Sequence, residues 1–320
     1  MLDLRSDRLS LSLHEPGDGF YCGTRFDRSG VFASLLFQGV EMAGAWYSRY
    51  DPFMHDAVKG PAEEFSPIGF DGDDGTFLKI GVGLLRRPDD GKPYDRFRLY
   101  EIVDPGVWTF GTEGEREAWF RHEMRGTYCY EKRVCLLDDG GFTISHKLRS
   151  EGPLLEGEVY NHNFFTFGCF AVGPSREIDF PFRPDGSWRS VYDSVGFTPS
   201  GVRFSRALQE GESVYSGDIH EAGSAGMPYD LTLRETAAAS GCHLERSLPD
   251  CHLERSREIS PCASLSRDDN APLTVRISGD VPVTRTVLWA NHRIACLEPY
   301  NAFRAAPSAP FRWSIRYRFD

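Results

Sequence analysis

Residues 126–150, GTYCYEKRVCLLDDGGFTISHKLRS, repeat with a period of two on both sides of a DDGG turn. From Tyr128 to Leu136 every second side chain falls on one face. From Phe142 to Leu148 the apolar residues share a face with His146. This period is typical of a β-strand, and glycine in the turn supplies the positive φ that a tight hairpin needs. The stretch therefore predicts an antiparallel β-hairpin.

The same alternation recurs in segments spread over the whole chain, at 29–40, 118–126, 271–279, 284–292 and 311–319. Convincing helical stripes longer than ten residues are absent, apart from a weak possibility at 113–120, EGEREAWF. Glycine and proline are distributed throughout, with no linker-like concentration. The pattern predicts an all-β protein: one domain over residues 1–320, built of two packed antiparallel sheets with long loops.

Composition narrows the class of partner. The chain has 320 residues, of which 40% are hydrophobic and 13% aromatic, as in globular proteins. Its net charge of −11 argues against a nucleic-acid partner and favours a neutral small molecule. No apolar run is long enough to span a bilayer, so no membrane partner is expected. The N-terminus has no apolar signal-peptide core, and a cytoplasmic location is expected.

The eight cysteines form two groups. In the first group the cysteines are scattered among apolar residues and are expected to be buried thiols: Cys22, Cys129, Cys135, Cys169 and Cys296. The second group belongs to a segment in which CHLERS occurs twice, at 242–247 and 251–256: Cys242, Cys251 and Cys262. A zinc site there is conceivable, but the spacing fits no compact ligand pair. A repetitive surface insertion at about 236–270 is the favoured interpretation.

Among the histidines, His162 is the unusual one. In YNHNFFTFG, residues 160–168, it lies between two asparagines and before an aromatic run. His122 and His146 lie on apolar strand faces and are expected in the core. His55 and His220 have acidic neighbours and either line a pocket or face solvent. The chain has no metalloprotease motif, no nucleophile elbow and no phosphate-binding loop, because the glycines of 76–85 are expected within a strand.

Glu298 is the comparable acidic residue. It lies in RIACLEPYNAF, residues 293–303, directly before Pro299, where a strand is expected to stop or bend. A carboxylate at the rim of a sheet, beside Cys296 and Tyr300, is partly desolvated. Desolvation raises its proton affinity toward values useful to a general base.

The order of these features resembles the aldose 1-epimerase (galactose mutarotase) superfamily, most closely a bacterial branch of epimerase-like proteins. In that family a strand of the form N-H-x-[YF]-F-x-[LF] carries a general-acid histidine, and residues 161–167 read NHNFFTF. A strand-end x-E-P motif carries the general-base glutamate, which CLEPY supplies as Glu298. The likeness runs from about residue 20 to the end, omitting about 236–270. It implies a large antiparallel β-supersandwich of the galactose mutarotase-like type.

The resemblance also implies a reaction. Glu298 takes the proton of the anomeric hydroxyl while protonated His162 donates to the ring oxygen, the sugar opens, and closure on the other face gives the other anomer. No metal and no cofactor is required. Asn161 and Asn163 are expected to orient the imidazole or to hold sugar hydroxyls. The partner is then a small-molecule sugar or an oligosaccharide end.

The chain departs from the family at the sugar-binding residues, because the family's N-x-R arginine and second histidine (H-G-x-x-R) have no clear counterpart here. Lys79 is either a sugar-contacting cation or a snorkelling edge residue. Arg25 hydrogen-bonds the sugar or, as favoured, pairs with Asp27. Asp218 replaces a substrate-binding aspartate or simply occupies a turn. Two tryptophans are candidates for stacking on a pyranose face or for the core: Trp46 and Trp289.

Two alternatives to an epimerase stay open. One is a non-catalytic sugar-binding module that retains the cleft. The other is a different sugar-active enzyme on the same fold. A lyase needs a tyrosine base, for which Tyr160 and Tyr300 are the candidates. A sugar-phosphate epimerase needs arginines at the cleft, and the arginines are dispersed along this chain.

Overall fold

The computed structural model describes residues 1–190, 193–221, 224, 226–236 and 272–320. These residues form 24 β-strands and no helix, and every strand pairing is antiparallel. Within this described part, no helix has the length and apolar character needed to cross a bilayer. The predicted all-β class is therefore confirmed. The predicted insertion at about 236–270 lies outside the described residues, except Thr236, and so do Cys242, Cys251 and Cys262.

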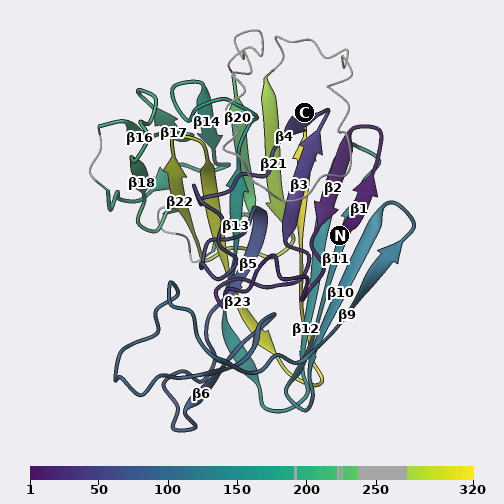
Figure 1. Cartoon of the computed structure of the whole chain (residues 1–320). Helices are drawn as coiled ribbons and strands as arrows, with labels where there is room; N and C mark the ends of the chain where they lie inside the picture. The colour runs from purple at the N-terminus through teal and green to yellow at the C-terminus, as the bar shows by residue number, and fades with distance from the viewer. Residues whose placement is uncertain (191–192, 222–223, 225, 237–271) are drawn as a thin grey trace.

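The largest sheet has ten strands and forms one layer of the sandwich (Figure 1). In spatial order it consists of β16 (Val195–Thr198), β17 (Gly201–Phe204), β14 (Arg176–Asp179), β20 (Asp230–Glu235), β21 (Leu273–Gly279), β24 (Phe311–Phe319), β12 (Gly141–Ser150), β11 (Tyr128–Leu136), β10 (Glu117–Met124) and β9 (Val107–Glu113).

Two smaller sheets make the facing layer. The five-stranded sheet runs β18 (Ser213–Tyr215), β22 (Arg285–Asn291), β23 (Ala295–Ala305), β13 (Leu155–Phe165) and β5 (Gly60–Phe65). The four-stranded sheet runs β1 (Leu2–Arg5), β2 (Leu9–Leu13), β3 (Phe32–Phe37) and β4 (Val40–Glu41). Aromatic contacts join the layers: Phe65 packs on Tyr130 and Trp313, with ring centroids 5.4 and 6.0 Å away. Phe165 packs on Tyr317 at 6.0 Å.

The remaining strands form two small sheets outside the sandwich. One is β6 (Thr76–Lys79), β7 (Gly83–Arg86) and β8 (Ile102–Asp104), and the other is β15 (Pro184–Asp185) with β19 (His220–Glu221). Residues 76–85 are therefore a hairpin, and the prediction of a single strand there is wrong. Gly81 has φ +75° in the turn, and an added Cβ would lie 2.3 Å from Asp27 Oδ1. Only glycine allows that turn to form.

The predicted hairpin at 126–150 is confirmed, with β11 and β12 paired from Tyr128↔Ser150 to Leu136↔Phe142. The weak helical possibility at 113–120 is wrong, because β10 begins at Glu117 and pairs on both sides, with β9 and β11. Residues 118–124 bury alternate side chains, so pairing on both edges and a buried face decide in favour of a strand. As expected, His122 and His146 are buried in the core.

A buried ionic cluster crosses the space between the layers. Glu63 of β5 accepts hydrogen bonds from His146 of β12, at 2.9 Å, and from Asn161 of β13, at 3.0 Å. Lys132 of β11 pairs with Glu63 and lies 3.6 Å from Asp27. Charged groups are buried favourably only when they are paired in this way. The cluster anchors β5 and β13, and so it sets the position of the strand that carries His162.

Candidate active site

A cavity of about 970 Å³ opens beside the five-stranded sheet, and both His162 and Glu298 line it. Its walls come from that sheet, from the segment between β7 and β8, and from residues before β3 and β16. Besides the two predicted catalytic residues, the lining includes four arginines and six large aromatic residues: Arg25, Arg96, Arg189, Arg285, Trp46, Tyr94, Phe97, Tyr215, Trp289 and Tyr300. The volume and the mixture of aromatic and charged groups suit a monosaccharide or the end of an oligosaccharide.

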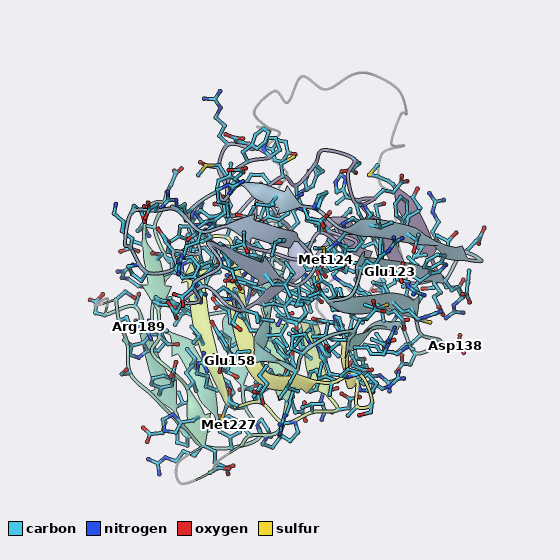
Figure 2. All side chains as sticks on the ribbon, turned by 90° about the horizontal axis from the view of Figure 1, so that it is seen from below. Glu123, Met124, Asp138, Glu158, Arg189 and Met227 are labelled. Carbon is cyan, nitrogen blue, oxygen red and sulfur yellow. The ribbon has the colours of Figure 1, made fainter. Side chains whose placement is uncertain are left out.

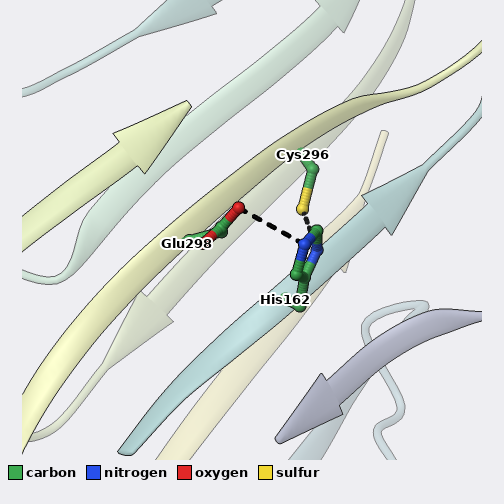
Figure 3. A group of neighbouring side chains, drawn as sticks. All are labelled: His162, Cys296 and Glu298. Carbon is green, nitrogen blue, oxygen red and sulfur yellow. Dashed lines mark hydrogen bonds and ion pairs between the residues drawn. The ribbon is translucent and has the colours of Figure 1, made fainter. Parts of the chain in front are cut away.

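His162 and Glu298 face one another because β13 and β23 are neighbours in the sheet. The pairs Tyr160↔Tyr300 and Asn163↔Leu297 flank them in a single register, which sets His162 opposite Glu298. His162 Nε2 lies 3.3 Å from Glu298 Oε1 (Figure 3). The strand was expected to stop or bend at Pro299; Pro299 lies inside β23, so the strand does not stop there. Proline has no N–H to donate, and the strand continues past a local gap in the ladder.

The imidazole of His162 is fixed on three sides. Its ring stacks on Phe164, with centroids 3.7 Å apart, and meets the edge of Phe26 at 5.7 Å. Its Nδ1 lies 2.6 Å from Cys296 Sγ. Burial raises the pKa of Cys296 well above its ordinary value, so this residue is a thiol that hydrogen-bonds Nδ1. The opposite ring nitrogen, Nε2, faces Glu298 and is placed to take up or release a proton there.

Burial and neighbouring charges push the two proton affinities in opposite directions. Burial raises the pKa of Glu298 from 4.5 to about 7, although Arg25 and Arg96 act to lower it. Burial lowers the pKa of His162 well below its ordinary value, and the positive charges of Arg25 and Arg96 lower it further. Near neutral pH the pair therefore holds at most one titrating proton, besides the N–H of the neutral imidazole. Glu298 makes only long contacts, with Tyr300 Oη 3.4 Å from Oε2, so its oxygens are open to a ligand.

One carboxylate, that of Glu64, organises the wall beside this pair. Arg25 Nε donates to Glu64 Oε2 over 2.6 Å, and Arg96 Nε lies 3.6 Å from Oε1. The hydroxyl of Tyr160 donates to Glu64 and accepts from both arginines, each at 3.0 Å. The expected pairing of Arg25 with Asp27 is wrong, because Asp27 bonds Ser29, Tyr130 and Lys132. Arg25 instead lines the cavity.

Three of the predicted sugar-binding residues do not line the cavity. Lys79 belongs to an edge strand but is fully buried, donates to the carbonyl of Phe65 and lies 3.9 Å from Glu64, so it is neither a cavity cation nor a snorkelling residue. Asn161 and Asn163 also point away from it. Asn161 donates to Glu63, while Asn163 donates to the carbonyl of Leu297 over 2.9 Å. Neighbouring residues in a strand face opposite sides, so they cannot share the face of His162.

Asp218 and Trp289 do line the cavity. Asp218 lies 3.4 Å from Arg285, and its side chain is 52% exposed, so its oxygens can accept hydrogen bonds from a ligand. Trp289 packs against Trp46 with ring centroids 4.7 Å apart. His55 meets the edge of Trp46 and lies 3.4 Å from Arg25, whereas His220 is exposed.

The burial of the cysteines agrees with the expectation only in part. Cys129 and Cys296 are buried and Cys22 and Cys135 half-buried, but Cys169 is exposed. In the described residues, one group of side chains offers three ligand atoms within 4.8 Å of one another: His162, Cys296 and Glu298. The sulfur faces Nδ1 of His162 and the carboxylate faces Nε2. A metal ion binds one ring nitrogen, so this orientation of the imidazole does not present all three ligands to one ion.

Sequence reasoning missed Arg96, Arg189 and Arg285 as cavity residues. Arg96 and Arg189 lie in connecting segments that have no period, so no local pattern marks them. Arg285 begins β22, whose central residues are all buried, and a charge at that place was the one available signal. Its guanidinium covers the ring of Tyr300 at 3.9 Å.

The fold matches the galactose mutarotase-like structures, as the resemblance implied. A GalM/aldose epimerase homologue from C. elegans is 11% identical, with a TM-score of 0.52 over 100% of this chain and 98% of its own. A protein from Synechocystis sp. is 14% identical, with a TM-score of 0.51 over 99% and 94%. A proposed aldose 1-epimerase from Klebsiella pneumoniae is 8% identical, with a TM-score of 0.51 over 98% and 77%.

At these identities the likeness describes the fold alone. Comparison with protein-family models and with curated protein sequences found no match. What the cavity does must therefore be argued from its own side chains.

Proposed function

We propose that the protein interconverts the α and β anomers of an aldose by general acid–base catalysis. One observation carries the proposal: His162 and Glu298, 136 residues apart in sequence, lie 3.3 Å apart on the wall of one cavity. Anomer interconversion needs one group that takes a proton and one that gives a proton, and it needs neither an oxidant nor a nucleophile.

The chemistry follows from the single proton that the pair holds. The basic member accepts the proton of the anomeric hydroxyl, and the acidic member donates to the ring oxygen. The C1–O5 bond breaks and an open-chain aldehyde forms. Rotation about C1–C2 exposes the other face, and ring closure returns both protons. Each residue acts once as acid and once as base over the cycle, so pKa values near the working pH are suitable.

The resemblance assigns the first proton abstraction to Glu298, with His162 protonated. In the free protein the charges of Arg25 and Arg96 oppose protonation of His162, while burial favours protonation of Glu298. We infer that the free protein holds the shared proton on Glu298. The first step then uses neutral His162 as base and Glu298 as acid, or begins after transfer of that proton across the 3.3 Å contact.

The same site can be compared with the needs of the two alternatives, a lyase and a non-catalytic binding module. A lyase needs a tyrosine that loses its proton readily. Burial raises the pKa values of both Tyr160 and Tyr300, which disfavours that role. A binding module needs the cavity but not the acid–base pair. It therefore predicts that changes at His162 and Glu298 affect affinity alone.

Polarimetry on freshly dissolved α-glucose and α-galactose tests the proposal. The wild-type protein is expected to accelerate mutarotation of at least one sugar. The variants His162→Ala and Glu298→Gln should each lose about 10²-fold or more, the usual contribution of a positioned acid or base. His220→Ala and Glu156→Gln are matched controls, because both side chains are exposed and neither lines the cavity. Measurable sugar binding without acceleration would favour the binding module.

A further inference from the structure

Five basic side chains line the cavity, although the whole chain carries a net charge of −11. They come from separate parts of the sequence: Arg25 before β3, Lys92 and Arg96 between β7 and β8, Arg189 between β15 and β16, and Arg285 on β22. The arginines that are dispersed in the sequence are therefore gathered in the folded chain. This gathering removes the sequence-based objection to a charged sugar.

These cations differ in how many carboxylates lie close enough to balance their charge. Arg285 donates to Glu158 over 2.9 Å and lies 3.4 Å from Asp218, so its charge is balanced by two carboxylates. Figure 2 shows Glu158 toward the same side of the molecule as Arg189, with Asp138 at the opposite side. The Arg285 end of the cavity has no excess positive charge.

The wall beside the acid–base pair is different. Three cations share the one carboxylate of Glu64: Arg25 at 2.6 Å, Arg96 at 3.6 Å and Lys79 at 3.9 Å. Among the described residues, no other carboxylate lies within ion-pair distance of these three. Glu298 offsets the excess only in part, because burial keeps it partly protonated near neutral pH. This wall therefore retains positive charge in a poorly solvated place.

Arg189 adds a further cation on the same side as the glutamate. Its guanidinium lies 5.1 Å from the ring centre of Tyr215, and it makes no ion pair with any residue that the structure describes. Tyr215 links the two groups. After burial, Glu298 is the main influence that raises the pKa of Tyr215, while Arg189 and Arg96 lower it. The backbone N–H of Arg189 also donates to the carbonyl of Tyr215 over 2.8 Å, and both residues line the cavity with Glu298.

We propose that the cavity takes a sugar that carries an anionic group, a phosphate or a carboxylate, and that Arg96 and Arg189, with Lys92 at the rim, bind this group. The inference rests on the proposed function for the placement of the anomeric carbon at His162 and Glu298. The anionic group then lies on the side of the sugar ring that faces Arg96 and Arg189.

The physical reason is the balance of charge. Arg25 and Lys79 are buried and Arg96 is half-buried, and cations in such places that share too few carboxylates are unfavourable until an anion joins them. Lys92 and Arg189 are exposed and add further attraction for that anion. Guanidinium groups bind phosphate and carboxylate through paired hydrogen bonds, which a neutral hydroxyl cannot match. A neutral hexose would leave the excess charge of Arg25, Arg96 and Lys79 uncompensated. An anionic sugar supplies the missing charge and fixes the orientation of the ring.

The test compares glucose, glucose 6-phosphate and glucuronate as substrates for mutarotation, with inorganic phosphate as a competitor. We expect kcat/KM for one of the anionic sugars to exceed that for glucose at least tenfold, with the advantage decreasing as NaCl is added. Preference for glucose 6-phosphate assigns the anionic group as a phosphate, and preference for glucuronate assigns it as a carboxylate.

The variants Arg96→Gln and Arg189→Gln should remove most of this preference, with a smaller loss for glucose. Arg293→Gln is the matched control, an exposed arginine that does not line the cavity. Urea denaturation of each variant establishes that it is folded.

Other outcomes separate this inference from the proposed function. Equal or better turnover of glucose overturns the anionic class and leaves the epimerase proposal standing. The anionic class is also overturned if inorganic phosphate competes as strongly as glucose 6-phosphate at the same concentration. The sugar would then contribute nothing to binding. If no sugar is turned over, calorimetry decides. Tenfold tighter binding of an anionic sugar than of glucose, lost in Arg189→Gln, keeps the ligand class and refutes the epimerase, and equal binding refutes both.

Discussion

Replacing Glu298 with glutamine should make the protein more stable at alkaline pH while it removes the acid–base pair. Glutamine has nearly the same shape as glutamate but does not ionise. The pKa of Glu298 is raised by burial from 4.5 to about 7, a difference of about 2.5. At about 1.4 kcal/mol for each factor of ten in proton affinity, ionising this buried carboxyl costs about 3 kcal/mol of folding stability.

The direction in which the free energy of unfolding changes with pH follows from proton binding. Between about pH 4.5 and 7 the folded wild-type chain holds the Glu298 proton and the unfolded chain has lost it. The free energy of unfolding therefore falls as pH rises through this window. Above about pH 7 both states are ionised and the loss is complete. Glu298→Gln has no such loss, so it should match the wild type near pH 4.5 and exceed it by about 3 kcal/mol near pH 8.

Urea unfolding at a series of pH values measures this difference. His162 titrates in both proteins, so its contribution largely cancels in the comparison. Glu156→Gln serves as the control, because its side chain is exposed and involves no buried ionisation. A stability difference that stays constant from pH 4.5 to 8, or that favours the wild type at pH 8, would refute the assignment of a buried, reluctantly ionised Glu298.

Three other predictions follow from the same contacts. The wild-type mutarotation rate should fall as pH rises through about 7, because the pair then loses its shared proton; a pH–rate profile that keeps rising to pH 8 would contradict this. Cys296→Ala should lower kcat several-fold more than Cys296→Ser, since only serine keeps a hydrogen-bonding group near Nδ1 of His162; equal values in the two variants would show that the thiol does not orient the ring. Arg25→Gln should cost about 3 kcal/mol in urea unfolding, because it removes the nearest cation from buried Glu64; a loss below about 1 kcal/mol would mean that Arg96 and Lys79 suffice.

The fold could be predicted from the sequence wherever a strand buries one of its faces. In 126–150 the alternation, the turn glycine and the buried face all predict the same hairpin, and the structure has it. The hairpin at 76–86 was missed because its strands are short and Gly81 interrupts them without an obvious turn motif. The requirement for glycine comes from the nearby Asp27, a long-range contact that local pattern cannot show.

The site was predictable in part. His162 and Glu298 stand out for their surroundings, and a register that joins β13 to β23 brings them together. The period of two already implied that Asn161 and Asn163 face away from His162. Lys79 could not be placed, because its burial depends on Glu64 and the carbonyl of Phe65. The gathering of Arg96, Arg189 and Arg285 depends on how three distant segments meet, which no single stretch encodes.

The most direct test of the central claim is the anomeric exchange rate at equilibrium, measured by NMR saturation transfer between the α and β H1 signals of glucose and glucose 6-phosphate. The acid–base pair of His162 and Glu298 predicts exchange with the wild-type protein that is faster than in buffer, and that returns to the buffer rate in both His162→Ala and Glu298→Gln. Enhanced exchange that survives in either folded variant would contradict the claim that this pair performs the proton transfers.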